Sequence, residues 1–207
     1  MWLKGVAFDW RFVAPFPFTV SVVVAAGLAI EHWLWRQPWA TWYFKRPDLR
    51  GTWMVEMISS WKAREDDPPL PPIIGYIAVK QTFSSLQMHL MTSESESWLV
   101  AEAILPAPHG DSFRICAVYE NRPNLKLRET GASPWKQGAF TIVTHGKLHR
   151  PEAANGDYWT DQKTNGTMAL TDRRIQVLTR FIDCQNMWEP EKGEPERAAA
   201  TLGSDLL

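Results

Sequence analysis

The chain has 207 residues, a formal net charge of -1 and 45% hydrophobic residues. This length is sufficient for one domain with a sizeable core. The balanced charge gives no signature of DNA or RNA binding, which would show as a basic surplus. The two cysteines fit no zinc or redox spacing, and two free thiols in a reducing cytosol are favoured over a disulfide framework.

An apolar segment predicts one membrane-spanning helix over residues 12–35, after an N-terminal flank of residues 1–11. No residue from Phe12 to Ile30 is charged, and this run matches the ~20 residues that a helix needs to cross the hydrocarbon layer. A cleaved signal peptide ending near "AAGLA" and a buried core helix are the alternatives. Both are weaker, because the run is long, an aromatic belt follows it and no amphipathic face is visible.

The linker of residues 36–47 is aromatic and basic, and it predicts the orientation of the chain. Its tryptophans and its tyrosine, Trp39, Trp42 and Tyr43, suit the headgroup layer of a bilayer. An excess of Lys and Arg on this side of the span marks the cytoplasmic face. We therefore expect a single-pass membrane protein whose C-terminal bulk lies in the cytoplasm.

Residues 48–188 consist of short strand-like segments separated by turn-rich pieces. In "GTWMVEMISSW" the alternation places Trp53, Val55 and Met57 on one face. Many short strands without a long helical period indicate an antiparallel sandwich or barrel. We expect a mainly β fold, a compact antiparallel lipocalin-like barrel of about eight strands, with Trp53 packed at one end. Closure of the sheet would leave no exposed edge beside the membrane.

The end of the chain carries two weaker signals. Residues 172–188, "DRRIQVLTRFIDCQNMW", fit either a final strand or a short helix. Residues 189–207 are rich in Glu, Pro and small residues, which is typical of a disordered tail.

No arrangement of residues predicts catalysis. The sequence lacks a nucleophile elbow, a P-loop and a dinucleotide-binding fingerprint. His145 and His149 in "HGKLH" are four residues apart, a spacing that suits a metal on a helix and not on the strand end expected here. We expect no enzyme, no metal and no cofactor. A hydrolase or transferase that uses these two histidines is the minor alternative.

Polar and aromatic residues in the expected strands indicate a ligand site inside the barrel. A small anionic ligand that contains bases needs cations or N–H donors for its phosphates and flat faces for its bases. The aromatic residues also fit plain core packing, and Lys80 and Arg114 also fit solvated charges on the outer face. The candidate ligand-binding residues are Lys80, Gln81, Arg114, Tyr119, Asn121, Tyr158, Trp159 and Thr160.

Four segments in order resemble one known family. They are "LWRQPWATWYFKRPDLRGTWMVEM", "IAVKQTFSSLQMHLMTSESES", "VYENRPN" and "GDYWTDQKTNGTMAL". They are similar to the SMODS-associating two-transmembrane β-barrel family, the membrane effectors of CBASS-type bacterial antiphage defence, and the likeness runs from about Trp33 to Leu170.

The resemblance implies a function. A CD-NTase-type nucleotidyltransferase would make a cyclic oligonucleotide second messenger, and the cytoplasmic barrel would bind it, a cyclic dinucleotide above all. The liganded effector would form a homo-oligomer and disrupt the inner membrane in abortive infection. In a related arrangement the nucleotide restrains the effector instead.

The chain departs from this family in its membrane segment. The family has two spanning helices, whereas "MWLKGVAFDWRFV" is too short and too charged to be the second. We expect either a single-span variant, with a periplasmic N-terminus, or a chain whose beginning is missing. The alternative function is a membrane-anchored lipocalin-like carrier that faces the periplasm and holds a small apolar ligand.

Overall fold

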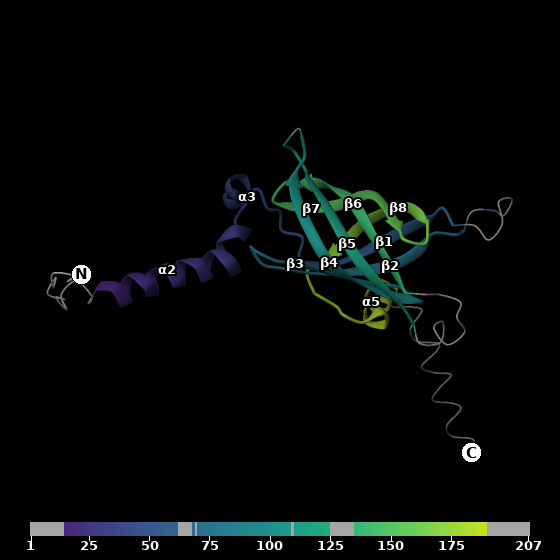
Figure 1. Cartoon of the computed structure of the whole chain (residues 1–207), viewed down its shortest axis with the longest axis horizontal. Coiled ribbons are helices and arrows are strands. Elements are labelled where there is room, and N and C mark those ends of the chain that lie inside the picture. Colours follow the sequence, from purple (N-terminus) through teal and green to yellow (C-terminus); the bar gives the residue numbers. More distant parts are fainter. Residues whose placement is uncertain (1–14, 62–67, 69, 109, 125–134, 190–207) are drawn as a thin grey trace, which may run out of the picture.

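A computed structural model describes residues 15–61, 68, 70–108, 110–124 and 135–189 (Figure 1). The helices are α2 (Pro15–His32), the short 3-10 helix η1 (Leu34–Arg36), α3 (Pro38–Phe44) and α5 (Phe181–Trp188). The strands are β1 (Gly51–Ser59), β2 (Ile73–Gln81), β3 (Leu86–Met91), β4 (Ser95–Pro106), β5 (Phe113–Pro123), β6 (Lys136–Lys147), β7 (Arg150–Thr160) and β8 (Asn165–Arg174).

The eight strands form one closed barrel in chain order. Each strand pairs antiparallel with the next, and β8 pairs with β1. No strand of the barrel is therefore left as an open edge. The prediction of a mainly β fold with an antiparallel barrel of about eight strands is confirmed.

The alternation in β1 directs its apolar side chains into the barrel. Trp53, Val55 and Met57 are all buried, as predicted, because alternate side chains of a strand point to the same face. Gly51 begins the strand with a φ of 125°, where a Cβ would collide with the carbonyl oxygen of Arg174. The glycine of the Gly-Thr-Trp sequence thus allows β8 to approach the start of β1.

Helix α2 projects from the barrel (Figure 1), and its apolar side chains are exposed. Within the described part of the chain, one helical segment, Pro17–Arg36, is long and apolar enough to cross a membrane, with a mean hydropathy of 1.5 and 6% of its residues buried. Phe18 is 73% exposed and Val23 is 65% exposed. This exposure argues against the alternative of a buried core helix. The expected N-terminal flank of residues 1–11 lies outside the described residues.

The C-terminal segment contains both elements that its sequence fitted. β8 continues to Arg174, and α5 packs on the outer face of β2, where the ring of Tyr76 lies 5.5 Å from that of Phe181 and 5.1 Å from that of Trp188. The expected disordered tail lies beyond the described residues except for Glu189.

Candidate ligand-binding site

The barrel has two unlike ends, and its proximal end is the one next to α2. The turn between β2 and β3 reaches this helix: the backbone N–H of Phe83 donates to the carbonyl oxygen of Glu31 at 3.0 Å. The hydroxyl of Ser84 donates to the Glu31 carboxylate at 2.6 Å. The opposite end, where β1 ends and β2 begins, is called the distal end.

Buried side chains fill the proximal end. Trp53 is 1% exposed, and its indole N–H donates to the carbonyl oxygen of Leu49 at 2.9 Å. The guanidinium of Arg173 lies over this ring, 5.1 Å from the centroid, and donates to the backbone carbonyls of Asp48, Arg50 and Pro151. The chain that leads from the helices into β1 is therefore held against the barrel, and Trp53 packs at this end as predicted.

An ion cluster accompanies this packing. Burial favours the neutral form of Asp48, but the hydrogen bonds and charge of Arg50, together with the charge of Arg173, outweigh it and lower the pKa of Asp48. Burial lowers the pKa of Arg173 to about 10 while Asp48 opposes this change. Both groups therefore carry their charges at neutral pH, and Arg173 and Asp48 form an ion pair at 3.3 Å.

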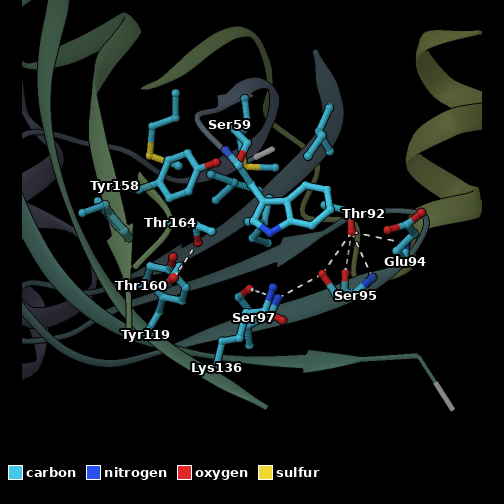
Figure 2. A pocket seen from close by; sticks show the side chains of 18 of the residues that line it. Ser59, Thr92, Glu94, Ser95, Ser97, Tyr119, Lys136, Tyr158, Thr160 and Thr164 are labelled. Atoms are coloured by element: carbon cyan, nitrogen blue, oxygen red, sulfur yellow. Dashed lines mark hydrogen bonds between the residues drawn. The ribbon is translucent and has the colours of Figure 1, made fainter. Parts of the chain in front are cut away.

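A cavity of about 860 Å³ occupies the distal half of the barrel (Figure 2). Its volume falls in the range of ~300–1,000 Å³ that is usual for small-molecule sites. Apolar side chains form its inner part: Met57, Ile77, Met88, Leu90, Leu99, Phe140 and Met168. Hydroxyl and amide side chains gather toward the distal end: Ser59, Thr92, Ser93, Ser95, Ser97, Tyr119, Asn121, Tyr158, Thr160, Gln162 and Thr164.

A hydrogen-bond network holds one polar wall of the cavity. The amide of Asn121 on β5 donates to the hydroxyls of Ser95 and Ser97 on β4, each at 2.9 Å. Lys136 on β6 is the register partner of Asn121, and Figure 2 shows it near Ser97. Because both amide protons are used, the carbonyl oxygen of Asn121 is the part of this side chain that is left to accept a bond from a ligand.

Two tyrosines reach the cavity because each faces a glycine on the neighbouring strand. Tyr119 pairs with Gly138 and Tyr158 pairs with Gly166. A Cβ on Gly138 would lie 2.6 Å from the Tyr119 hydroxyl, and one on Gly166 would lie 2.8 Å from the Tyr158 ring. Burial raises the pKa of Tyr119 to about 12, with smaller effects from Tyr158 and Asp161. This phenol is therefore neutral and able to donate a hydrogen bond at physiological pH.

The charge of the cavity is small. Among its described lining residues, Lys136 and Glu94 are the two with charged side chains. Lys136 makes no ion pair with any described residue, and its register partner on β5 is the amide residue Asn121. An anionic ligand would therefore meet one ammonium group, one carboxylate and many neutral hydroxyl and amide groups.

The structure brings together four of the eight candidate residues. Tyr119, Asn121, Tyr158 and Thr160 all line the cavity. Gln81 lies at the other end of the barrel, where its amide accepts from the Leu49 N–H at 2.8 Å and donates to the Pro47 carbonyl at 2.9 Å.

The three remaining candidates point outward. Lys80 is exposed beside the proximal end. Arg114 is exposed on the outer face of β5, next to the buried Ile115. Trp159 is 49% exposed, on the face of β7 opposite to that of Tyr158. None of the three lines the distal cavity.

Several lining residues were not among the candidates. Lys136 begins β6 two residues before Gly138 and four before the buried Phe140, so that it shares their inward face. Ser95 and Ser97 stand at alternate positions of β4 in the same way. The signal in the sequence that could have identified such residues is a hydroxyl side chain at an inward position next to the end of a strand.

The described residues contain no group of three or more His, Cys, Asp or Glu side chains placed to hold a metal ion. His145, one of the two histidines considered above, contacts the side chain of Asn155 instead.

A closed antiparallel barrel, filled at one end and hollow and polar at the other, defines a small-ligand-binding barrel. A family model described as "Cap15, cyclic dinucleotide receptor domain" matches residues 44–172. The chain belongs to this family, the cyclic dinucleotide receptors of CBASS effectors. The resemblance seen in the sequence is thereby confirmed, and the family is one of receptor domains rather than of catalysts.

No curated protein matches the chain. A redesigned β-barrel of known structure is similar over 61% of this chain and 92% of its own, with 13% sequence identity and a TM-score of 0.37.

Proposed function

We propose that this protein is a membrane-anchored effector whose cytoplasmic barrel binds a cyclic dinucleotide in the distal cavity. The cavity and its polar end, in a chain that belongs to the cyclic dinucleotide receptor family, carry this proposal. The sensing unit would comprise residues 48–188, and the span and linker would comprise residues 12–35 and 36–47.

The cavity has a place for each part of such a ligand. Bases suit the inner part, where apolar side chains and the faces of Tyr119 and Tyr158 offer stacking surfaces. Phosphates suit the distal end, where Lys136 supplies a charge. The hydroxyls of Thr160 and Thr164 are bonded to each other at 2.6 Å, which leaves one hydroxyl proton of the pair to donate to a phosphate. The carbonyl oxygen of Asn121 would accept a base N–H and so contribute to the choice of base.

The output of the receptor would act through the membrane. The exposed apolar helix α2 would cross the inner membrane, with the basic linker and the barrel on the cytoplasmic side. Ligand binding would change the equilibrium between dispersed and assembled copies, to the extent that the ligand prefers one state. Anchoring in a bilayer raises the effective concentration of these copies, so that modest new contacts are sufficient for a homo-oligomer that disrupts the membrane.

Calorimetry on the full chain in detergent, titrated with cyclic dinucleotides of different bases, tests the proposal. Lys136→Ala is the test variant and Arg114→Ala is its matched control, because Arg114 carries the same charge on the outer face. Loss of a charged hydrogen bond to phosphate costs about 1.5–3 kcal/mol, which corresponds to roughly 10- to 150-fold weaker binding. Arg114→Ala is expected to bind like the unchanged chain.

Two outcomes would contradict this site. Equal losses in both variants would show that the phosphates do not meet Lys136 specifically. Binding of an apolar ligand, with no heat from any cyclic dinucleotide, would favour the alternative of an apolar carrier, which the inner part of the cavity also fits.

A further inference from the structure

A second hollow lies at the proximal end of the barrel. It is a cleft of about 360 Å³, lined by Asp48, Arg50, Val79, Lys80, Gln81, Arg150, Arg173, Ile175 and Val177. It shares no lining residue with the distal cavity. The cyclic dinucleotide site therefore does not account for it.

The cleft carries a strong positive charge. Four of its lining residues are Lys or Arg, against the single carboxylate of Asp48. Arg50 and Arg173 both pair with this carboxylate, at 2.8 and 3.3 Å. Lys80 and Arg150 are exposed, and neither makes an ion pair with a described residue. These two cations are therefore available to an anion from solution or from a membrane.

The cleft also lies close to the end of the apolar helix α2. Lys80 precedes Phe83 by three residues, and the N–H of Phe83 bonds to Glu31 in the last turn of α2. Three residues span at most about 10 Å. The cleft is thus close to the point where α2 would leave the hydrocarbon layer.

An apolar rim distinguishes this cleft from a site for a free anion. Ile175 lines it and is 76% exposed, and Val177 lines it two residues further on. Trp33, directly after α2, and Trp42 on the linker are 60% and 72% exposed, and tryptophan prefers the boundary between headgroups and acyl chains. Exposed apolar side chains next to unpaired cations match a bilayer surface, where phosphates border hydrocarbon.

We propose that this cleft binds the phosphate of an anionic phospholipid, with Lys80 and Arg150 as the phosphate contacts and Ile175 inserted between acyl chains. This inference rests on the proposed membrane span and is independent of the cyclic dinucleotide site. Such binding would hold the filled end of the barrel on the membrane and leave the distal cavity directed toward the cytoplasm.

Native mass spectrometry of the full chain, released from zwitterionic detergent, tests this site. The chain is titrated with phosphatidylglycerol and, separately, with phosphatidylcholine of the same acyl chains, which measures lipid bound through hydrocarbon alone. The test variant is Lys80→Ala/Arg150→Ala. The matched control is Lys163→Ala/Arg180→Ala, which removes two exposed cations outside the cleft.

The unchanged chain and the control are expected to bind phosphatidylglycerol more tightly than phosphatidylcholine. The test variant is expected to lose roughly 30-fold in phosphatidylglycerol affinity, since each of the two cations near an anionic lipid surface contributes about fivefold. Equal affinities for the two lipids, or equal losses in both double variants, would overturn the proposal. Equally tight binding of sn-glycerol 3-phosphate would overturn it in favour of a site for soluble phosphates.

Calorimetry of the test variant with cyclic dinucleotide separates this inference from the proposed function. Unchanged nucleotide binding together with lost lipid preference supports an independent lipid site. Loss of nucleotide binding in this variant would contradict that independence.

Discussion

The substitution Asp48→Asn removes the negative charge from the ion cluster at the proximal end of the barrel. Asp48 is 8% exposed and pairs with Arg50 and Arg173, and the side chain of Arg173 is 7% exposed. Removing one partner of a buried ion pair costs about 3–5 kcal/mol. Arg173 keeps its bonds to backbone carbonyls, and asparagine still accepts a hydrogen bond, so we expect a smaller loss of about 2–3 kcal/mol.

The assay is thermal unfolding of the full chain in detergent. A loss of 1 kcal/mol lowers Tm by roughly 2–4 °C in a protein of this size, so Asp48→Asn is expected to lower Tm by about 4–12 °C. Asp172→Asn is the matched control, because Asp172 forms an exposed ion pair with Arg174, and such pairs contribute ~0–1 kcal/mol.

The pH dependence supplies a second check on the same substitution. The pKa of Asp48 is lower in the folded chain than its usual value of 3.8. Its contribution to stability is therefore complete above the unfolded pKa and is lost as the pH falls through the folded value. The advantage of the unchanged chain over Asp48→Asn should persist from pH 7 to about pH 5 and diminish below pH 4. Equal Tm values for Asp48→Asn and Asp172→Asn at pH 7 would refute the reasoning.

Further predictions concern the cavity and the cysteines. Gly138→Ala is expected to weaken cyclic dinucleotide binding by roughly tenfold or more, as measured by calorimetry. Its Cβ would lie 2.6 Å from the tyrosine hydroxyl of Tyr119 and 2.5 Å from the backbone carbonyl oxygen of Trp159, so both the ring and the pairing of β6 with β7 must shift. Unchanged affinity would show that this ring does not shape the site. Burial raises the pKa of Cys184 to about 11, so a thiol reagent at pH 8 is expected to modify the half-buried Cys116 and leave Cys184 intact. Rapid modification of both thiols in the folded chain would contradict the packing of α5.

The fold could be predicted from the sequence because its strands are short and their apolar residues stand at alternate positions. In β1 the apolar residues Trp53, Val55 and Met57 stand at alternate positions, and all three are buried. The position of β8 against β1, by contrast, depends on Gly51 and Arg174 approaching each other across more than a hundred residues. Alternation predicts a face within one strand, whereas pairing between distant strands requires the closed structure.

The ligand site could be predicted from the sequence only in part, because the type of a residue does not show which face of its strand it occupies. Tyr119 and Asn121 share the inward face of β5, and Arg114, five positions from Tyr119, must lie on the other face. Tyr158 and Trp159 are adjacent, so that one strand could not direct both inward.

Gln81 illustrates a different limit. A glutamine at an inward position of an apolar strand fits a ligand contact, and its actual partners are the backbone groups of Pro47 and Leu49. Those groups come from the chain that precedes β1, and its path across the proximal end was not predictable from local pattern. The structure, and not the sequence, therefore shows which end of the barrel is filled and which end is hollow.

Hydrogen exchange of the full chain, with and without cyclic dinucleotide, tests the central claim most directly. We expect the ligand to protect the distal segments 92–97, 119–121 and 158–164, which line the cavity. Exchange around Gln81 and Phe113, at the filled proximal end, is expected to stay the same. Protection confined to the proximal end, or no protection by any cyclic dinucleotide, would contradict a receptor whose ligand lies in the distal cavity.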